Sequence, residues 1–86
     1  MELNKVIVMM RLEDGSDIKV STKSENKPFS VENYNEILRK IECDFVSKCD
    51  DCIYFTVRRT LHNKKDNWKV KTLKELTDLL KIIFNV

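Results

Sequence analysis

Thiol and imidazole side chains are the groups in this chain that could bind a metal or act as nucleophiles. Cys49 and Cys52 form a Cys-x-x-Cys pair, Cys43 precedes them, and His62 is the only histidine. Such residues are typical zinc ligands. The segment from Cys52 to His62 is predicted below to be one continuous strand, however, and a strand of about ten residues spans roughly 33 Å. We therefore do not expect His62 to share a metal with the cysteines. A mixed zinc site, in which Asp44, Asp50 or Asp51 would complete the cysteine ligands, remains an alternative.

Other chemistry has little support in the sequence. A Cys-x-x-Cys pair used for thiol exchange is followed by a helix, and here a strand follows. The single histidine, at a hairpin tip, has no evident nucleophile to activate. The only glycine, Gly15, cannot form a glycine-rich phosphate loop. The sequence therefore predicts ordinary thiols, no catalytic residues, no metal, no cofactor and a non-enzymatic protein.

Positive charge is concentrated after the cysteine pair. Between residues 58 and 71, one acidic residue, Asp66, stands among basic ones, which are Arg58, Arg59, Lys64, Lys65, Lys69 and Lys71. A basic two-stranded ribbon can contact phosphates or steer an acidic protein, and lysines also protect an edge strand. The net charge of the whole chain, +2, is too small to indicate nucleic acid by itself.

The first elements that would position these groups form a β-hairpin. Residues 5–12 are rich in apolar and β-branched types, as in a strand with both faces partly covered, and residues 16–23 alternate apolar with polar types. A three-residue loop with a left-handed Gly15 would pair Met10 with Ile18 and Val8 with Val20. The apolar sets then coincide, which supports this register. Residues 24–28 are predicted to be a connector.

A helix is predicted to follow. Ser30 is expected to be its N-cap, with Phe29 and Tyr34 spaced as a hydrophobic staple. Apolar residues then recur at helical spacing through about residue 45 and predict one buried face, made of Val31, Tyr34, Ile37, Leu38, Ile41 and Phe45. The helix is expected to end near residues 47–49.

A second hairpin is predicted to begin at Cys52, with Leu61 opposite Trp68. One face then carries Ile53, Phe55, Val57, Leu61, Trp68 and Val70, and the other carries Tyr54, Thr56, Arg58, Thr60, His62, Lys69 and Lys71. Arg59 falls on the apolar side, where it is expected to extend to solvent or to pair with a helix carboxylate such as Asp78. A capping box over residues 72–75 begins a second helix, whose apolar positions are Leu73, Leu76, Leu79, Leu80 and Ile83.

The predicted order is therefore ββα followed by ββα, a pseudo-repeat of pattern rather than of residue identity. Two helices on one face of a four-stranded, mainly antiparallel sheet would bury both apolar stripes and leave the other sheet face open. We predict an α+β fold, a two-layer sandwich, as a single domain over residues 1–86.

The open face is expected to carry apolar residues among basic ones: Ile7, Met9, Tyr54, Arg11, Lys19, Arg58, Lys69 and Lys71. Such a surface is typical of a partner interface, with Lys64 and Lys65 at the adjacent tip, although an ordinary solvated face has similar composition. The leading hypothesis is a small protein-binding domain that acts as an inhibitor or adaptor. Homodimerisation through this face is compatible with it. The alternative is a nucleic-acid-binding regulator that places Arg58, Lys64, Lys65, Lys69 and Lys71 on phosphates.

Composition bounds the setting. With 42% hydrophobic and 35% charged residues, a folded domain is expected. No apolar run reaches the roughly 18 residues of a membrane span, the start lacks a signal pattern, and an odd number of cysteines suits a reducing compartment. We expect a cytoplasmic protein without membrane contact. The absence of Ala and Gln beside abundant Lys, Asn and Ile suggests an AT-rich genome. A narrower hypothesis is thus a phage or mobile-element protein that inhibits a bacterial defence complex, as an anti-CRISPR does.

Overall fold

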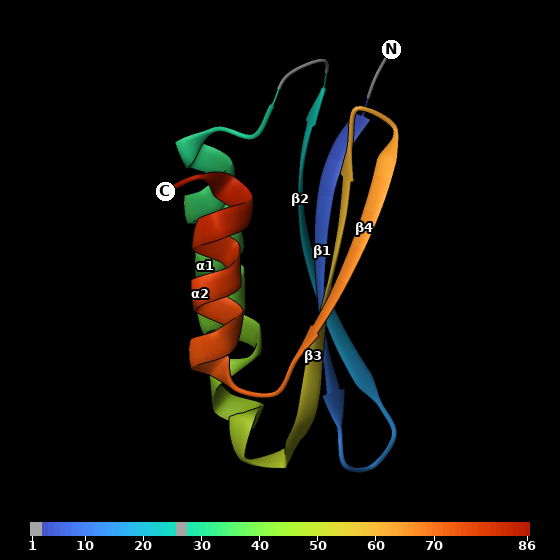
Figure 1. Cartoon of the computed structure of the whole chain (residues 1–86). Helices are drawn as coiled ribbons and strands as arrows, with labels where there is room; N and C mark the ends of the chain where they lie inside the picture. The colour runs from blue at the N-terminus through green and yellow to red at the C-terminus, as the bar shows by residue number, and fades with distance from the viewer. Residues whose placement is uncertain (1–2, 26–27) are drawn as a thin grey trace.

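The computed structural model describes residues 3–25 and 28–86. The elements follow in the order β1 (Leu3–Leu12), β2 (Asp17–Glu25), α1 (Val31–Asp44), the 3₁₀ helix η1 (Val46–Asp51), β3 (Cys52–Leu61), β4 (Lys64–Val70) and α2 (Leu73–Phe84). The strands form one antiparallel sheet in the order β2-β1-β3-β4. Both helices lie on the same face of this sheet (Figure 1). The predicted α+β fold with two layers is therefore confirmed.

The first hairpin has the predicted register. Met10 pairs with Ile18 and Val8 with Val20. The backbone N–H of Leu12 donates to the carbonyl of Ser16 at 2.9 Å, and Gly15 adopts a φ of 89°, in the left-handed region where only glycine is unstrained. Strand β2 is longer than expected, because residues 24 and 25 continue it. Residues 26–27 of the predicted connector lie outside the described residues.

Helix α1 begins at the predicted N-cap. Asn33 N–H donates to Ser30 Oγ at 3.2 Å, and Ser30 N–H donates to Asn33 Oδ1 at 3.0 Å. Val31 is 64% exposed, so its assignment to the buried face was wrong: it is the first helical residue, one turn before the residues that reach the sheet. The helix ends at Asp44, and the 3₁₀ helix η1 occupies the region where we expected the α-helix to stop.

The second hairpin differs from the predicted register. Leu61 pairs with Lys64, and Trp68 pairs with Val57 rather than with Leu61. His62 and Asn63 have φ values of 51° and 65° and form a two-residue turn with both residues left-handed. The difference amounts to an even number of residues, so each side chain keeps its predicted face even though its partner changes. Trp68 accordingly lies on the helix side, where it packs against the core.

Ile53 was predicted to face the core and is 50% exposed instead. Strand β3 contains a bulge at this point, because Arg11 pairs with Tyr54 whereas the next residue, Leu12, pairs with Cys52. Ile53 is the extra residue of the bulge, which interrupts the alternation on which the prediction depended.

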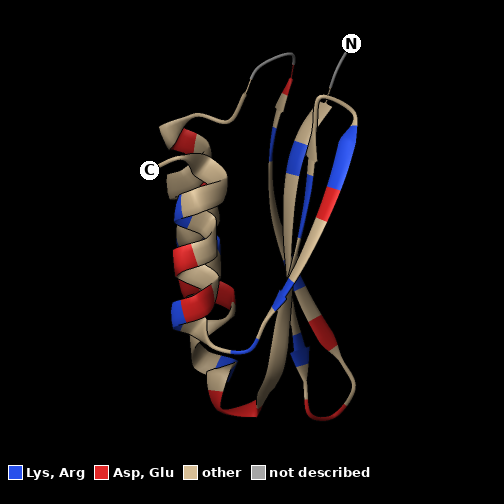
Figure 2. Cartoon of the chain, viewed as in Figure 1, with Lys and Arg blue, Asp and Glu red and all other residues tan. Residues whose placement is uncertain are grey.

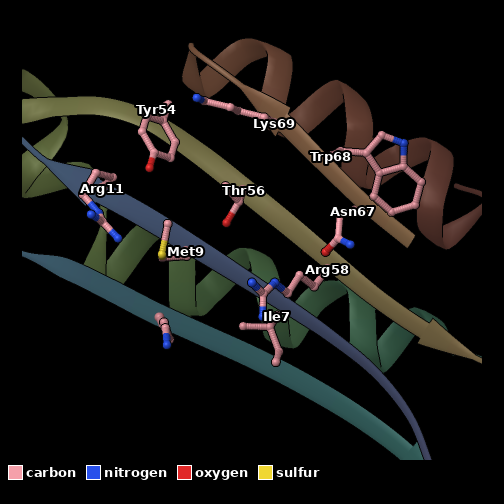
Figure 3. A pocket seen from close by; sticks show the side chains of 10 residues that line it. Ile7, Met9, Arg11, Tyr54, Thr56, Arg58, Asn67, Trp68 and Lys69 are labelled. Carbon is pink, nitrogen blue, oxygen red and sulfur yellow. The ribbon is translucent and has the colours of Figure 1, made fainter. Parts of the chain in front are cut away.

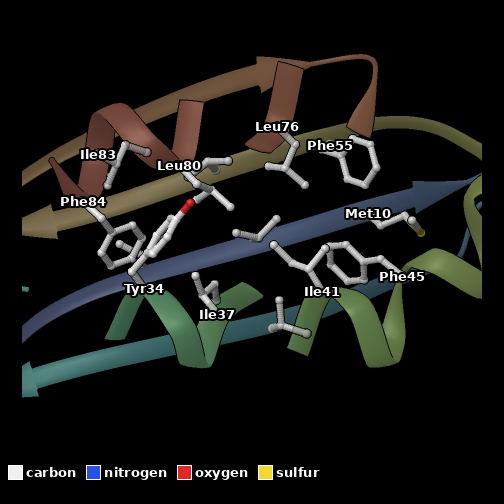
Figure 4. Close-up of a cluster of buried hydrophobic side chains, with 14 of the residues drawn as sticks. Met10, Tyr34, Ile37, Ile41, Phe45, Phe55, Leu76, Leu80, Ile83 and Phe84 are labelled. Carbon is white, nitrogen blue, oxygen red and sulfur yellow. The ribbon is translucent and has the colours of Figure 1, made fainter. Parts of the chain in front are cut away.

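The core lies between the sheet and the two helices (Figure 4). Strand β1 contributes Val6, Val8 and Met10, all fully buried, and β3 contributes Phe55 and Val57. The helices cover them with a set that includes Tyr34, Ile37, Ile41, Leu76, Leu80, Ile83 and Phe84. Thr72 caps α2 as predicted, since Glu75 N–H donates to its Oγ1 at 3.0 Å. No helix in the described part of the chain is long and apolar enough to cross a membrane.

Candidate partner-binding face

The sheet side that faces away from the helices is called the outer face here. It consists of every second residue of each strand, and the register sets these residues in rows across the sheet. One row reads Lys19, Met9, Thr56 and Lys69, and the next reads Ser21, Ile7, Arg58 and Asn67. Residues almost fifty positions apart in sequence therefore become neighbours on one surface (Figure 3).

The centre of the outer face is an open hollow of about 500 Å³. Ile7, Met9 and Tyr54 are half-buried and supply its apolar part. The remaining residues at its border are Arg11, Lys19, Thr56, Arg58, Asn67 and Lys69, together with Trp68 of β4, which also packs against the core on the helix side. The structure thus brings together the predicted residues Ile7, Met9, Arg11, Tyr54, Arg58 and Lys69.

Contacts within the hollow set how its polar groups are presented. Lys69 Nζ lies 4.1 Å from the centroid of the Tyr54 ring, a cation–π contact that covers one face of that ring. Arg11 Nη2 donates to Asp17 Oδ2 at 3.4 Å across the β1–β2 pair. Arg58 is exposed, and among residues 3–25 and 28–86 no carboxylate forms an ion pair with it. Arg58 is therefore available to an external acidic group.

A second hollow, of about 340 Å³, continues the first one toward the β3–β4 turn. The two share Ile7, Arg58 and Asn67. The second adds Lys5, Arg59, Thr60, Lys65 and Asp66. Together they form a trough along the strand direction, which would suit an elongated ligand better than a compact one.

The outer face is strongly basic. Its acidic residues are Asp17 and Glu25 of β2, whereas its basic residues are Lys5, Arg11, Lys19, Lys23, Arg58, Lys65 and Lys69. This excess exceeds the net charge of the whole chain, +2, so the rest of the molecule is net acidic. Figure 2 shows basic residues along the strands and most acidic residues on the helices and turns, although the helices carry basic residues as well.

Three residues expected at or beside this surface are not among its outward-facing strand residues. Lys71 follows the end of β4 in the link to α2, so it is not part of the sheet. Lys64 begins β4 and, by alternation, lies on the side opposite Lys65. His62 belongs to the turn. Of the two lysines predicted at the tip, Lys65 is therefore the one on the outer face.

Arg59 is held by β4 and not by a helix carboxylate. Its Nη2 and Nε donate to Asp66 Oδ2 at 2.7 and 3.3 Å, and its guanidinium carbon lies 5.1 Å from the Trp68 ring centroid. The corrected register explains this contact, because it makes Asp66 the direct cross-strand partner of Arg59. These three side chains stabilise the hairpin on the helix side.

The cysteines lie away from the outer face. Cys43 is exposed, whereas Cys49 and Cys52 are half-buried and pack against the core. Burial raises the pKa of both the Cys49 and the Cys52 thiols above the ordinary value, which lowers the reactive thiolate fraction. Across the described residues, no three His, Cys, Asp or Glu side chains gather as metal ligands. His62 lies at the opposite end of β3 from Cys52.

Two features of the surface could not be predicted from the sequence. The bordering residue Asn67 carries no signal of its own, and the contact between Lys69 and Tyr54 depends on the β3–β4 register.

Comparison of the chain with protein-family models, curated proteins and solved structures found no match.

Proposed function

We propose that this chain is a small protein-binding domain that uses its outer face to bind an acidic surface on another protein, as an inhibitor or adaptor. The observation that carries the proposal is the hollow, in which Ile7, Met9 and Tyr54 lie within a border of basic side chains. An apolar centre with a polar rim is the usual composition of a protein interface. The complementary partner would present an apolar side chain surrounded by carboxylates.

The aromatic residues favour a protein over a nucleic acid. Single-stranded nucleic acids bind to sheets largely by stacking their bases on exposed rings. Trp68 packs on the helix side, and Lys69 covers one face of the Tyr54 ring. The aliphatic Ile7 and Met9 suit an apolar side chain better than a base.

Charge also bears on the kind of partner. Two copies that met through their outer faces would bring basic residues against basic residues, and like charges across an interface oppose association. An acidic partner would instead be attracted from a distance and would associate faster.

The narrower hypothesis, an inhibitor of a bacterial defence complex, is one kind of protein-binding inhibitor. It rests on the size and composition of the chain.

A charge-reversal experiment tests the proposal. Proteins that co-purify with the tagged chain from its native host would be identified, and the affinity of the purified partner measured. The double variant Lys19→Glu with Arg58→Glu is expected to weaken binding at least ~10-fold, about 1.4 kcal/mol, since both residues border the hollow.

The control variant is Arg39→Glu, which reverses one charge at an exposed position of α1, as Lys19→Glu and Arg58→Glu each do on the outer face. It is expected to leave the affinity unchanged, and both variants are expected to keep the wild-type thermal melt. Equal affinity of the double variant and the wild type would refute the proposal, as would an equal loss in the α1 control.

Nucleic-acid binding remains the second candidate because the second hollow brings Lys5, Arg58 and Lys65 together on the outer face. It predicts binding to a single-stranded oligonucleotide whose affinity falls steeply with salt, with a slope set by the number of phosphates neutralised. A titration from low to high salt measures that slope. No binding at low salt would eliminate this candidate.

A further inference from the structure

The sheet has two edge strands, and α1 covers one of them. The bond between Leu12 N–H and Ser16 C=O fixes which β2 residues bond to β1, and by alternation the backbone groups of Ser21 and Lys23 point to the free edge. Their carbonyls accept hydrogen bonds from Lys40 Nζ at 2.8 Å and from Asn33 Nδ2 at 3.1 Å. Side chains of α1 therefore occupy part of the β2 edge.

The β4 edge is open. Leu61 and Lys64 flank the two-residue turn and exchange its hydrogen bonds, so alternate residues beyond them point their backbone groups away from β3. These residues are Lys65, Asn67 and Lys69. In the part of the chain that the structure describes, no hydrogen bond reaches their edge-facing N–H and C=O groups. A row of unpaired backbone groups can accept a further strand.

The side chains of β4 indicate what kind of strand would fit. Lys65 and Lys69 project from the outer face, with Asn67 between them. Residues two positions apart in an added strand are separated by about 6.7 Å, the same spacing as the rows of the sheet. Acidic residues opposite Lys65 and Lys69 would be paired, whereas basic ones would be repelled. The two lysines on the β4 edge therefore disfavour pairing with a basic strand and favour pairing with an acidic one.

Residues on the other side of the added strand would lie beside Asp66 and Trp68. Trp68 is half-buried and contacts the core, so an apolar residue next to it would extend the core. A second copy of β4 does not meet these requirements. Antiparallel pairing of two copies about Asn67 would set Lys65 opposite Lys69.

We propose that the partner contributes an extended acidic segment that pairs with the β4 edge as a fifth strand and directs carboxylates to Lys65 and Lys69. This inference rests on the proposed function and specifies how the partner is held. Backbone bonds along β4 would supply part of the affinity, and the outer-face cations would supply the selectivity.

Synthetic peptides test the pairing directly. The first has the core Glu-Val-Thr-Val-Glu, which places glutamates outward and valines inward in either strand direction. The second replaces both glutamates by glutamine, and the third carries backbone N-methyl groups at the residues whose N–H would meet β4. Affinity is measured with a dye on the peptide. Emission of Trp68, the only tryptophan, reports contact at β4.

We expect the glutamate peptide to bind and to shift the Trp68 emission to shorter wavelength. Both altered peptides should bind at least ~10-fold more weakly, because one loses the charge pairs and the other loses the backbone hydrogen bonds to β4. In the protein, Asn67→Pro should have the same effect as N-methylation, since it removes an edge-facing N–H without breaking the β3–β4 ladder. Asn67→Ala is its control.

Each remaining outcome counts against the pairing. If N-methylation and Asn67→Pro leave the affinity unchanged while Lys19→Glu with Arg58→Glu abolishes it, the ligand lies across the outer face; the proposed function then survives without the fifth strand. If the glutamate peptide does not bind at millimolar concentration, the edge does not accept acidic strands. If single-stranded oligothymidylate displaces the peptide with higher affinity, the ligand is a nucleic acid. A dimer that Asn67→Pro dissociates would identify a second copy as the occupant.

Discussion

Lys69 and Arg59 show how neighbouring basic residues of one hairpin acquire different roles. Each contacts an aromatic ring, Tyr54 for Lys69 and Trp68 for Arg59. Strand alternation places the first pair on the outer face and the second on the helix side. The Arg59 charge is neutralised within the protein by Asp66, whereas Lys69 forms no ion pair with a described carboxylate. Only the outward pair can contribute its charge to a partner.

Asn4 is a residue whose role the sequence does not reveal. It is fully buried, and its Oδ1 accepts a hydrogen bond from the backbone N–H of His62 at 3.0 Å. Asn4 of β1 therefore holds the turn between β3 and β4, which is distant in sequence. A buried polar side chain of this kind is tolerated only because it is hydrogen-bonded.

Replacing Asn4 with alanine should lower the free energy of unfolding by about 1–3 kcal/mol, because the His62 N–H loses this acceptor and a small cavity forms where the buried Asn4 side chain was. Urea denaturation of wild type and variant measures the change. Asn67→Ala, at an exposed asparagine, is the control and should change stability little. Equal stability of Asn4→Ala and wild type would show that the turn does not depend on this bond.

At the scale of elements, the β3–β4 turn decides the register of the hairpin. Neither turn residue is glycine, yet both adopt left-handed backbone conformations. Asparagine tolerates this conformation better than other non-glycine residues do, which makes Asn63 suitable for the second turn position. By fixing the register, this turn also directs the backbone groups of Lys65, Asn67 and Lys69 to the open edge of β4.

The variant Asn63→Val should therefore destabilise the protein by about 1–2 kcal/mol, since a β-branched residue is strongly disfavoured at positive φ. Asn63 is exposed, so little packing is lost with its side chain. The matched control is Asn67→Val, the same replacement in extended backbone, which should be neutral or stabilising. Thermal melts compare the two variants. An equal loss at both positions would contradict a conformational cause.

At the scale of the whole molecule, charge is separated between the layers, with the sheet basic and the remainder net acidic (Figure 2). This separation has a cost on the outer face. Lys5 and Lys23 are direct cross-strand partners, and like charges in that arrangement repel each other. A predominantly basic outer face is therefore expected to make the protein less stable than a face of mixed charge would.

Lys23→Glu should accordingly stabilise the protein by about 0.2–1 kcal/mol at low salt, because a repulsive pair becomes an attractive one. The melting temperature should rise, and the gain should shrink as salt screens the pair. Lys23→Gln should give an intermediate value. A lower melting temperature for Lys23→Glu at low salt would mean that repulsion across the β1–β2 pair is not significant.

Local features of the sequence predicted local structure well. The first hairpin register, the Ser30 cap and the Thr72 cap agree with the structure, because each depends on residues close together in the chain. The second hairpin register was wrong, since residues 62–67 are polar and have no glycine to mark the turn. The bulge at Ile53 was missed because it depends on how β3 pairs with β1.

The sequence by itself determined which face of the sheet most strand residues occupy. Alternation has a period of two residues, so the basic and apolar outward positions of β1 and β3 followed from the pattern even where the register was wrong. Only the tertiary structure decided that β1 lies beside β3, which brings Ile7 and Met9 next to Arg58 and Thr56 and leaves β4 at an open edge. Strand order results from burying the whole core at once, and that long-range requirement leaves no local pattern in the chain.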